Sequence, residues 1–227
     1  MTELVQIKEE SNYCLITMDD GKVNALSFDM IAAVNTALDQ AEQAGKVVLL
    51  CGRPGKFSAG FDLSIMGQGG DAMFDLLRAG AELSRRIVNF DTPVVLAVSG
   101  HALAMGALLL LSADYRIGML GNYKIGLNEV AIGMTLPYFG VALARARLAS
   151  THLNKAVGLA QIYDASGAVE AGYLDEAVTE EELLPRAIAQ AEHLSALNMK
   201  AHKHSKARVR EELNAALDAA FEKELSK

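Results

Sequence analysis

Apolar residues in the first half of the chain occur in short runs that predict buried strands. Val47–Cys51 and Val94–Val98 are continuous apolar runs of strand length, which is typical of strands covered on both faces. Val5–Lys8 and Cys14–Met18 predict two further strands, with Glu10–Asn12 as the turn between them. The pattern therefore favours a sheet formed mainly by the first half of the chain.

Longer segments with helical spacing lie between these strands. Ser27 is a suitable N-cap for a helix that reaches about Gln43, and Gly45 then ends this helix. Helices are also predicted at about Asp71–Val88 and at about Gly106–Ala113, the second of which is very apolar. This alternation of strands and helices indicates an α/β fold.

The chain is expected to be almost entirely helical from about residue 136 onward. Thr179 and Glu182 have the spacing of a capping box for a helix that runs to about Ala196. A last, strongly charged helix is expected at about Lys200–Leu225. Strand–helix units therefore come first in the chain, and helices come last.

The composition narrows the possible classes of function. The 227 residues are 51% hydrophobic and carry a net charge of −7, which is typical of a globular chain and argues against nucleic acid as a partner. Cys14 and Cys51 lack disulfide-motif or zinc-site spacing, which favours a reducing compartment. The N-terminal residues contain no apolar signal core, and the longest uncharged apolar run, Ala102–Ala113, is shorter than the roughly 20 residues that cross a bilayer. We therefore expect a soluble, cytoplasmic protein without a membrane partner.

Several common cofactor and metal motifs are missing from the sequence. No Gly-rich dinucleotide fingerprint follows a predicted strand, and no phosphate-binding loop sequence occurs. His202 and His204 lie two residues apart on a predicted helix, so their side chains point to different sides and make a poor metal pair. Neither a metal nor a redox cofactor is expected.

Two Gly-containing stretches that follow predicted buried strands offer backbone N–H groups. Lys56–Leu63 contains small residues that can approach a ligand closely. Val98–Ala107 leads into the apolar helix, where unpaired N–H groups and the positive end of the helix dipole can hold a developing oxyanion. Each stretch, taken alone, is also compatible with an ordinary loop or with core packing.

A third stretch, Ile125–Pro137, contains one acidic residue in apolar surroundings. Glu129 is the only ionisable side chain between Lys124 and Arg145. Burial among apolar residues raises the pKa of a carboxyl group, which suits general acid–base catalysis. The alternative is a solvent-exposed glutamate on a loop, which is the commoner case for an isolated glutamate.

Taken together, the three stretches resemble the motifs of the crotonase family, also called the enoyl-CoA hydratase/isomerase family. The matching segments are Asn24–Leu26, Phe57–Leu63, Val98–Gly106, Ser112–Asp114 and Ala168–Gly172. The resemblance implies an α/β fold in which residues 1–178 form a crotonase-like spiral of β-β-α turns. Residues 179–227 would then form a C-terminal helical region that drives assembly into a homotrimer or a dimer of trimers.

The resemblance also implies roles for individual residues. The backbone N–H groups of Phe61 and Met105 are expected to hold the thioester oxygen, and Glu129 is expected to transfer protons. The second glutamate of family hydratases falls on Leu108, which cannot carry a proton. Gly126–Glu129 resembles the pattern of mitochondrial Δ3,Δ2-enoyl-CoA isomerases, which work with a single glutamate. The implied reaction moves the double bond of an enoyl-CoA from the 3,4 to the 2,3 position.

The ligand implied by the resemblance is an acyl-CoA thioester, with coenzyme A as part of the substrate and no separate cofactor. Lys22, Arg53 and Lys56 are candidates for binding its phosphates, although each is equally compatible with a solvated loop charge. The alternatives are a hydratase or another acyl-CoA enzyme of the family, and a non-catalytic acyl-CoA-binding protein. The full set of expected substrate contacts is Lys22, Asn24, Ala25, Ser58, Ala59, Gly60, Asp62, Leu63 and Leu108.

Overall fold

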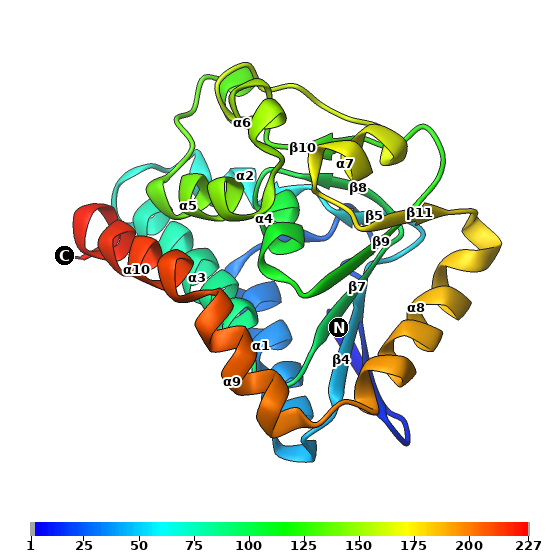
Figure 1. Ribbon diagram of the computed structural model, residues 1–227. Coiled ribbons are helices and arrows are strands. Elements are labelled where there is room, and N and C mark those ends of the chain that lie inside the picture. Colours follow the sequence, from blue (N-terminus) through cyan, green and yellow to red (C-terminus); the bar gives the residue numbers. More distant parts are fainter. Residues whose placement is uncertain (1–2, 227) are drawn as a thin grey trace.

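The computed structural model describes residues 3–226 and has a central sheet with helices on both faces (Figure 1). Six strands in the described residues form this sheet in the order β1-β2-β4-β7-β9-β11. β1 and β2 pair antiparallel, and every other neighbouring pair is parallel. The strands are β1 (Val5–Glu9), β2 (Tyr13–Met18), β4 (Val47–Cys51), β7 (Val94–Val98), β9 (Tyr115–Met119) and β11 (Glu176–Val178).

The central strands are buried on both faces, which confirms the prediction from their continuous apolar runs. In β4, Leu50 belongs to the larger of two apolar cores and Leu49 belongs to the second core. The larger core includes residues of α1 (Phe28–Ala44) and α3 (Gly70–Val88). The second core is covered by α8 (Glu180–Ser195), which therefore lies on the opposite face of the sheet.

Three consecutive strands of the main sheet are each followed by a short strand in a smaller sheet. β5 (Gly55–Ser58) follows β4, β8 (Gly100–Leu103) follows β7, and β10 (Ile125–Gly126) follows β9. These short strands form a parallel sheet in the order β10-β8-β5, and a further parallel pair joins β3 (Ala25–Leu26) to β6 (Gly60–Phe61). This repetition produces the spiral of β-β-α turns that the resemblance implies.

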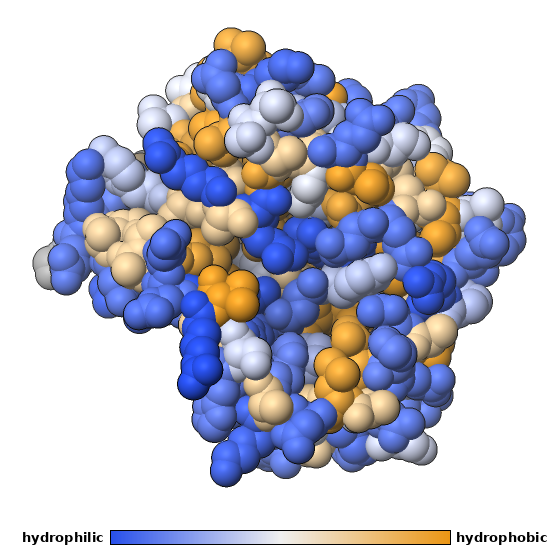
Figure 2. Space-filling model, viewed as in Figure 1, coloured by the Kyte–Doolittle hydropathy of each residue, from blue (hydrophilic) through white to orange (hydrophobic). Residues whose placement is uncertain are grey.

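One helix of the larger core is buried along its whole length. Every residue of α4 (Met105–Ser112) is buried. The remaining helical segments are α2 (Leu63–Met66), the 3-10 turn η1 (Val130–Ile132), α5 (Tyr138–Arg147), α6 (Ser150–Val157), α7 (Ala165–Ala171), α9 (Met199–Val209), α10 (Glu211–Ala220) and the C-terminal π-helical turn η2 (Phe221–Leu225). Figure 2 shows that the displayed face is mostly polar, with a weakly apolar area where α5 and α10 meet.

The helix ends predicted from the sequence are largely confirmed. Ser27 caps α1 through a bond from the Met30 N–H to the Ser27 hydroxyl oxygen, and Gly45 ends α1 with a left-handed φ of 63°. Glu182 accepts a hydrogen bond from the Thr179 N–H, as expected for a capping box. The helix-capping residues predicted from the sequence therefore lie at the helix ends seen in the structure.

Two predictions for the C-terminal half are wrong. The expected helix at Lys200–Leu225 is broken at Arg210, whose guanidinium group turns inward, donates to the Val88 carbonyl oxygen and pairs with Asp114. One helix therefore ends at Val209 and the next begins at Glu211, with the Arg210 side chain held by these buried contacts between them. The expectation of an almost entirely helical segment also missed β11, whose pairing partner β9 lies far away in sequence.

Candidate active site

The two stretches expected to form an oxyanion hole lie side by side. A Cβ atom added to Gly60 would lie 2.8 Å from Ala104 Cβ and 3.2 Å from Met105 N. Such contacts are too close for a side chain, and Gly60 also has a positive φ of 96°. Glycine is therefore needed at position 60 to bring the backbone of β6 against the start of α4.

The backbone geometry leaves amide groups available at this junction. Asp62 N–H donates to the Leu26 carbonyl oxygen, so the preceding N–H, that of Phe61, points away from β3. Met105 is the first residue of α4, and the N–H groups of a first helical turn have no acceptor within the helix. Ala104 precedes α4 with a φ of 49°, an uncommon value for a residue other than glycine. Phe61 and Met105 thus bring two backbone donors to one place.

The side chains of these two residues pack against a glycine of α3. A Cβ atom added to Gly80 would lie 2.4 Å from Phe61 Cζ and 3.3 Å from Met105 Cε. Met105 is 1% exposed, so its side chain is accommodated in the core beside α3. Gly80 could not be predicted as a site residue, because a glycine within a predicted helix carries no signal of its spatial partner.

Glu129 is buried, so the alternative of an exposed loop residue is wrong. Its side chain is 7% exposed, and its Oε2 atom has no hydrogen-bond partner among the described residues. Burial raises the pKa of the Glu129 carboxyl group. Asn128, which the sequence analysis did not single out, has a buried Oδ1 atom that likewise lacks a partner in the described part of the chain.

A cavity of about 170 Å³ joins these groups. Ala59, Phe61, Leu63, Leu108 and Glu129 line it, so five of the residues expected at the site are brought together. Most of the remaining wall is apolar, and the sequence analysis did not identify it. These further lining residues are Met66, Leu77, Ala104, Asn128, Ile132, Met134, Thr135, Pro137 and Glu224.

Two of the expected substrate contacts support the loop from inside the protein. Asn24 is 0% exposed, and its Nδ2 donates to the carbonyl oxygens of Met18 and Phe57. Ser58 is also 0% exposed; its hydroxyl donates to the Asn24 carbonyl oxygen and accepts from the Gly60 N–H. Their polar side-chain atoms bond to the backbone around the oxyanion strands, and their place among the substrate contacts stays a prediction.

Other expected contacts lie at the surface beside this loop. Asp62 caps α2 by accepting from the Ser64 N–H at 2.8 Å, and Ala25 pairs with Gly60 through β3 and β6. The Arg53 guanidinium donates to the carbonyl oxygen of Lys22 at 2.7 Å.

The third cation, Lys56, pairs with Arg53 through a backbone bridge. The three candidate phosphate-binding cations, Lys22, Arg53 and Lys56, are therefore neighbours, with Asp19 paired to Arg53 at 3.0 Å.

Within residues 3–226, no group of three or more His, Cys, Asp or Glu side chains has the arrangement of a metal site. No helix in the same range is long and apolar enough to span a bilayer.

Comparison with known proteins identifies the family. A family model described as enoyl-CoA hydratase/isomerase matches residues 8–226. The chain belongs to the enoyl-CoA hydratase/isomerase family. A crystal structure of an enoyl-CoA hydratase/isomerase family protein from Pseudomonas syringae is 46% identical, with a TM-score of 0.95 over 97% of this chain and 96% of that chain.

Family members described as isomerases and family members described as hydratases are both similar to this chain. A structure described as an enoyl-CoA isomerase of Mycobacterium tuberculosis is 38% identical, with a TM-score of 0.94 over 98% of this chain and 97% of that chain. Another structure of the M. tuberculosis protein is described as a probable enoyl-CoA hydratase. Human mitochondrial enoyl-CoA delta isomerase 1 is 28% identical over 91% of this chain and 70% of the human protein. For the rat and mouse proteins of the same name, the match covers 65% of their length. A crotonyl-CoA hydratase of Syntrophomonas wolfei is 31% identical over 94% of this chain and 84% of the hydratase. This chain is an enzyme of the enoyl-CoA hydratase/isomerase family, and its relatives include both isomerases and hydratases.

Proposed function

We propose that this protein is a Δ3,Δ2-enoyl-CoA isomerase. The observation that carries the proposal is the place of Glu129, buried in a cavity that also contains Leu108 at the position of the second hydratase glutamate. A single glutamate can move a proton between two carbons, whereas activation of water for hydration uses a second carboxylate in the family's hydratases. The similarity to human enoyl-CoA delta isomerase 1 supports the same assignment.

The proposed reaction conserves protons and electrons. Glu129 removes a proton from C2 of the 3-enoyl-CoA, and the electron pair of the broken C–H bond moves onto the thioester oxygen. The N–H groups of Phe61 and Met105 stabilise this oxyanion; one such donor contributes about 3 kcal/mol in a preorganised site. Glu129 then returns the proton to C4 as the electrons form the C2–C3 double bond. A proton shuttle of this kind contributes on the order of 10²–10⁴ in rate.

Enoyl-CoA hydration is the second candidate, because a crotonyl-CoA hydratase is 31% identical. Product analysis separates the two reactions. Purified protein would be incubated separately with 3-enoyl-CoA and 2-enoyl-CoA, and the formation of 2-enoyl-CoA and 3-hydroxyacyl-CoA would be followed. We expect 2-enoyl-CoA as the product from 3-enoyl-CoA. Rapid 3-hydroxyacyl-CoA formation from 2-enoyl-CoA without isomerisation of 3-enoyl-CoA would establish the hydratase instead.

Replacement of Glu129 tests the proposed proton transfer. Glu129→Gln keeps the shape of the side chain but cannot accept the C2 proton. We expect the isomerisation rate to fall by at least about 10²-fold while acyl-CoA binding is retained. Single-turnover kinetics and calorimetric binding of a saturated acyl-CoA measure the two quantities. Isomerisation at the wild-type rate would exclude Glu129 as the base.

A further inference from the structure

A second carboxylate, unrelated to the proposed proton transfer, lines the same cavity. Glu224 lies in the C-terminal turn η2, and Glu129 is the other ionisable residue among those that line this cavity. Most of the remaining wall of the cavity is formed by aliphatic side chains and methionines, such as Leu63, Met66 and Leu77. An acyl chain in this cavity would therefore meet an apolar wall and then a carboxylate.

Glu224 is held in place by the start of α5. Its Oε2 atom accepts a hydrogen bond from the Tyr138 N–H at 2.8 Å, at a helix start where Pro137 provides no side-chain cap. Lys223 lies over the Tyr138 ring, with its Nζ 3.9 Å from the ring centroid, and the following Leu225 is 1% exposed. These contacts fix the turn against α5 and keep the neighbouring cation on the aromatic ring.

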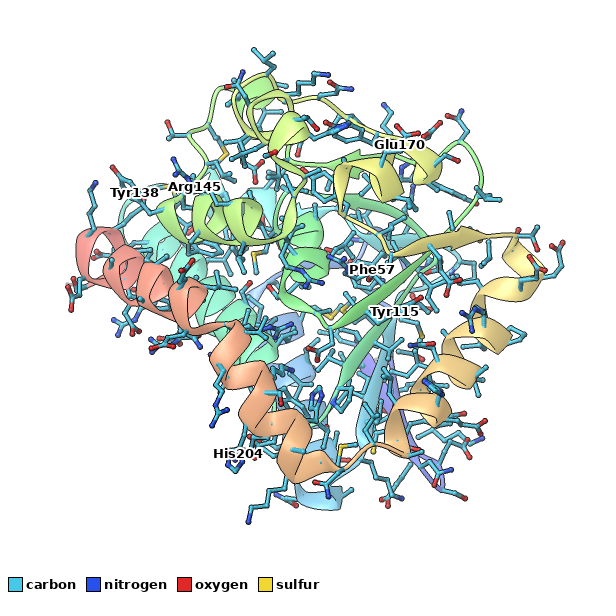
Figure 3. All side chains as sticks on the ribbon, in the orientation of Figure 1. Phe57, Tyr115, Tyr138, Arg145, Glu170 and His204 are labelled. Carbon is cyan, nitrogen blue, oxygen red and sulfur yellow. The ribbon has the colours of Figure 1, made fainter. Side chains whose placement is uncertain are left out.

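Glu224 lines the part of the cavity beside the C-terminal turn. Figure 1 shows the C-terminal turn at the edge of the molecule, whereas α4, whose first residue supplies an oxyanion amide, lies near the centre. In Figure 3, Tyr138, the residue bonded to Glu224, lies at the outer end of α5 beside this turn. The carboxylate is half-buried there, so water can reach it when no acyl chain fills this part of the cavity.

A carboxylate in this place distinguishes between acyl chains by their end groups. An alkyl chain that reached Glu224 would remove water from the carboxylate without replacing its hydrogen bonds, which is unfavourable. A hydroxyl group at the end of the chain would donate to the carboxylate and replace the lost water. Hydrogen bonds to charged groups are stronger than those between neutral groups.

We propose that Glu224 selects acyl-CoA thioesters whose acyl chain carries a hydrogen-bond donor at its far end. The inference rests on the proposed function to the extent that the cavity holds the acyl chain. Glu224 is thus a specificity-determining residue, and unsubstituted chains are preferred only when they are too short to reach it.

Calorimetric titration with saturated acyl-CoA thioesters tests the inference without turnover. The ligands form pairs of equal chain length, with and without a terminal hydroxyl group, in a series of increasing length. At the length that reaches Glu224, wild-type protein is expected to bind the hydroxylated ligand at least about tenfold more tightly than the alkyl ligand. Glu224→Leu should reverse this preference. Glu224→Gln keeps an oxygen for the Tyr138 N–H and should weaken the preference without reversing it.

Glu222→Gln is the matched control, because Glu222 is an exposed carboxylate of the same turn that does not line the cavity. It should keep the wild-type preference. Equal affinity for both ligands at every length in wild-type protein would overturn the inference and leave the proposed function intact. Failure to bind any acyl-CoA would instead contradict the proposed function. If Glu224→Leu does not fold, the same preference in Glu224→Gln as in wild type would overturn the inference.

Discussion

At the scale of single residues, the burial of Glu129 places a carboxyl group in the cavity and also lowers the stability of the folded protein at neutral pH. The unfolded chain has a glutamate pKa near its ordinary value, about 4.3, and burial raises the pKa in the folded protein. Below the unfolded pKa, both states hold the protonated acid and no cost arises. As the pH rises from the unfolded pKa through the folded pKa, the folded state loses stability relative to the unfolded state, because it must bury a charge.

Glu129→Gln should therefore stabilise the protein at neutral pH. The amide has no charge to bury, so the melting temperature of the variant is expected to exceed that of wild type at pH 7. The difference should vanish at about pH 4 and below, where wild-type Glu129 is protonated in both states. Thermal unfolding measured across this range gives the result. A difference in melting temperature that is independent of pH would contradict the assigned cause.

Gly80 offers a test of how the oxyanion backbone is positioned. A methyl group at Gly80 would overlap the ring of Phe61, so Gly80→Ala should push Phe61 and its N–H out of place. We expect kcat to fall by at least about tenfold, since misplacement of about 1 Å can reduce a rate by about 10². KM should change less.

A second substitution provides the control for Gly80→Ala. Phe61→Ala removes the ring and keeps the backbone donor, so it should retain activity alone and restore much of kcat in the Gly80→Ala background. Absence of rescue, with equal kcat losses in the single and double variants, would exclude this steric link. Alanine favours the helix over glycine, so a purely local effect on α3 would raise the melting temperature and leave kcat unchanged.

At the scale of elements, α4 has different partners at its two ends. Its first residue, Met105, lies at the candidate oxyanion site. At the other end, the Ala113 carbonyl oxygen accepts from the guanidinium groups of Arg147 at 3.2 Å and Arg210 at 3.3 Å. Cations at a helix C-terminus are favourable. Asp114 follows directly and pairs with Arg210 and with Lys206 at 2.9 and 2.6 Å.

Loss of the Asp114 charge should destabilise the fold strongly. Asp114→Asn leaves Lys206 and Arg210 buried without their counter-charge, which is expected to lower the free energy of unfolding by about 3–5 kcal/mol. Asp91→Asn is the control, because the Asp91–Lys203 pair is about half exposed and should contribute about 1 kcal/mol or less. Urea unfolding compares the two variants. Equal effects would show that burial does not determine the contribution of the Asp114 pairs.

The elements differ in how well the sequence predicts them. Buried strands such as β4 and β7 were predicted correctly, because their apolar runs are local and continuous. The short strands β5, β6 and β8 were missed, since each has two to four residues and exists only through pairing with distant segments. The same distinction applies to the site. Glu129 was found because it interrupts an apolar stretch. Gly80, which packs against Phe61, and Glu224, which lines the cavity, are placed by contacts that no local pattern records.

At the scale of the whole molecule, the part of the chain after residue 136 leaves apolar surface exposed. Leu159 is 69% exposed and Val209 is 84% exposed. A groove between α5 and α10 is lined largely by small apolar residues, including Ala142, Ala216 and Ala219, at the weakly apolar area in Figure 2. Surfaces of this kind favour association between protein chains.

We expect the protein to form a homotrimer or a dimer of trimers in solution. The expectation follows from the family fold and from the exposed apolar positions of the C-terminal half. Multi-angle light scattering at micromolar concentration should give three or six times the 24.2 kDa mass of one chain. A stable monomer under these conditions would contradict this prediction. The division into residues 1–178 and 179–227 stays a prediction.

The position of Glu224 in the chain separates it from the groups assigned to proton transfer. Phe61, Met105 and Glu129 belong to earlier segments of the chain, whereas Glu224 lies in the turn Phe221–Leu225. Glu224 is the one residue of this turn among those that line the cavity. Removal of residues 221–225 would therefore take Glu224 out of the cavity wall and leave Phe61, Met105 and Glu129 in the chain.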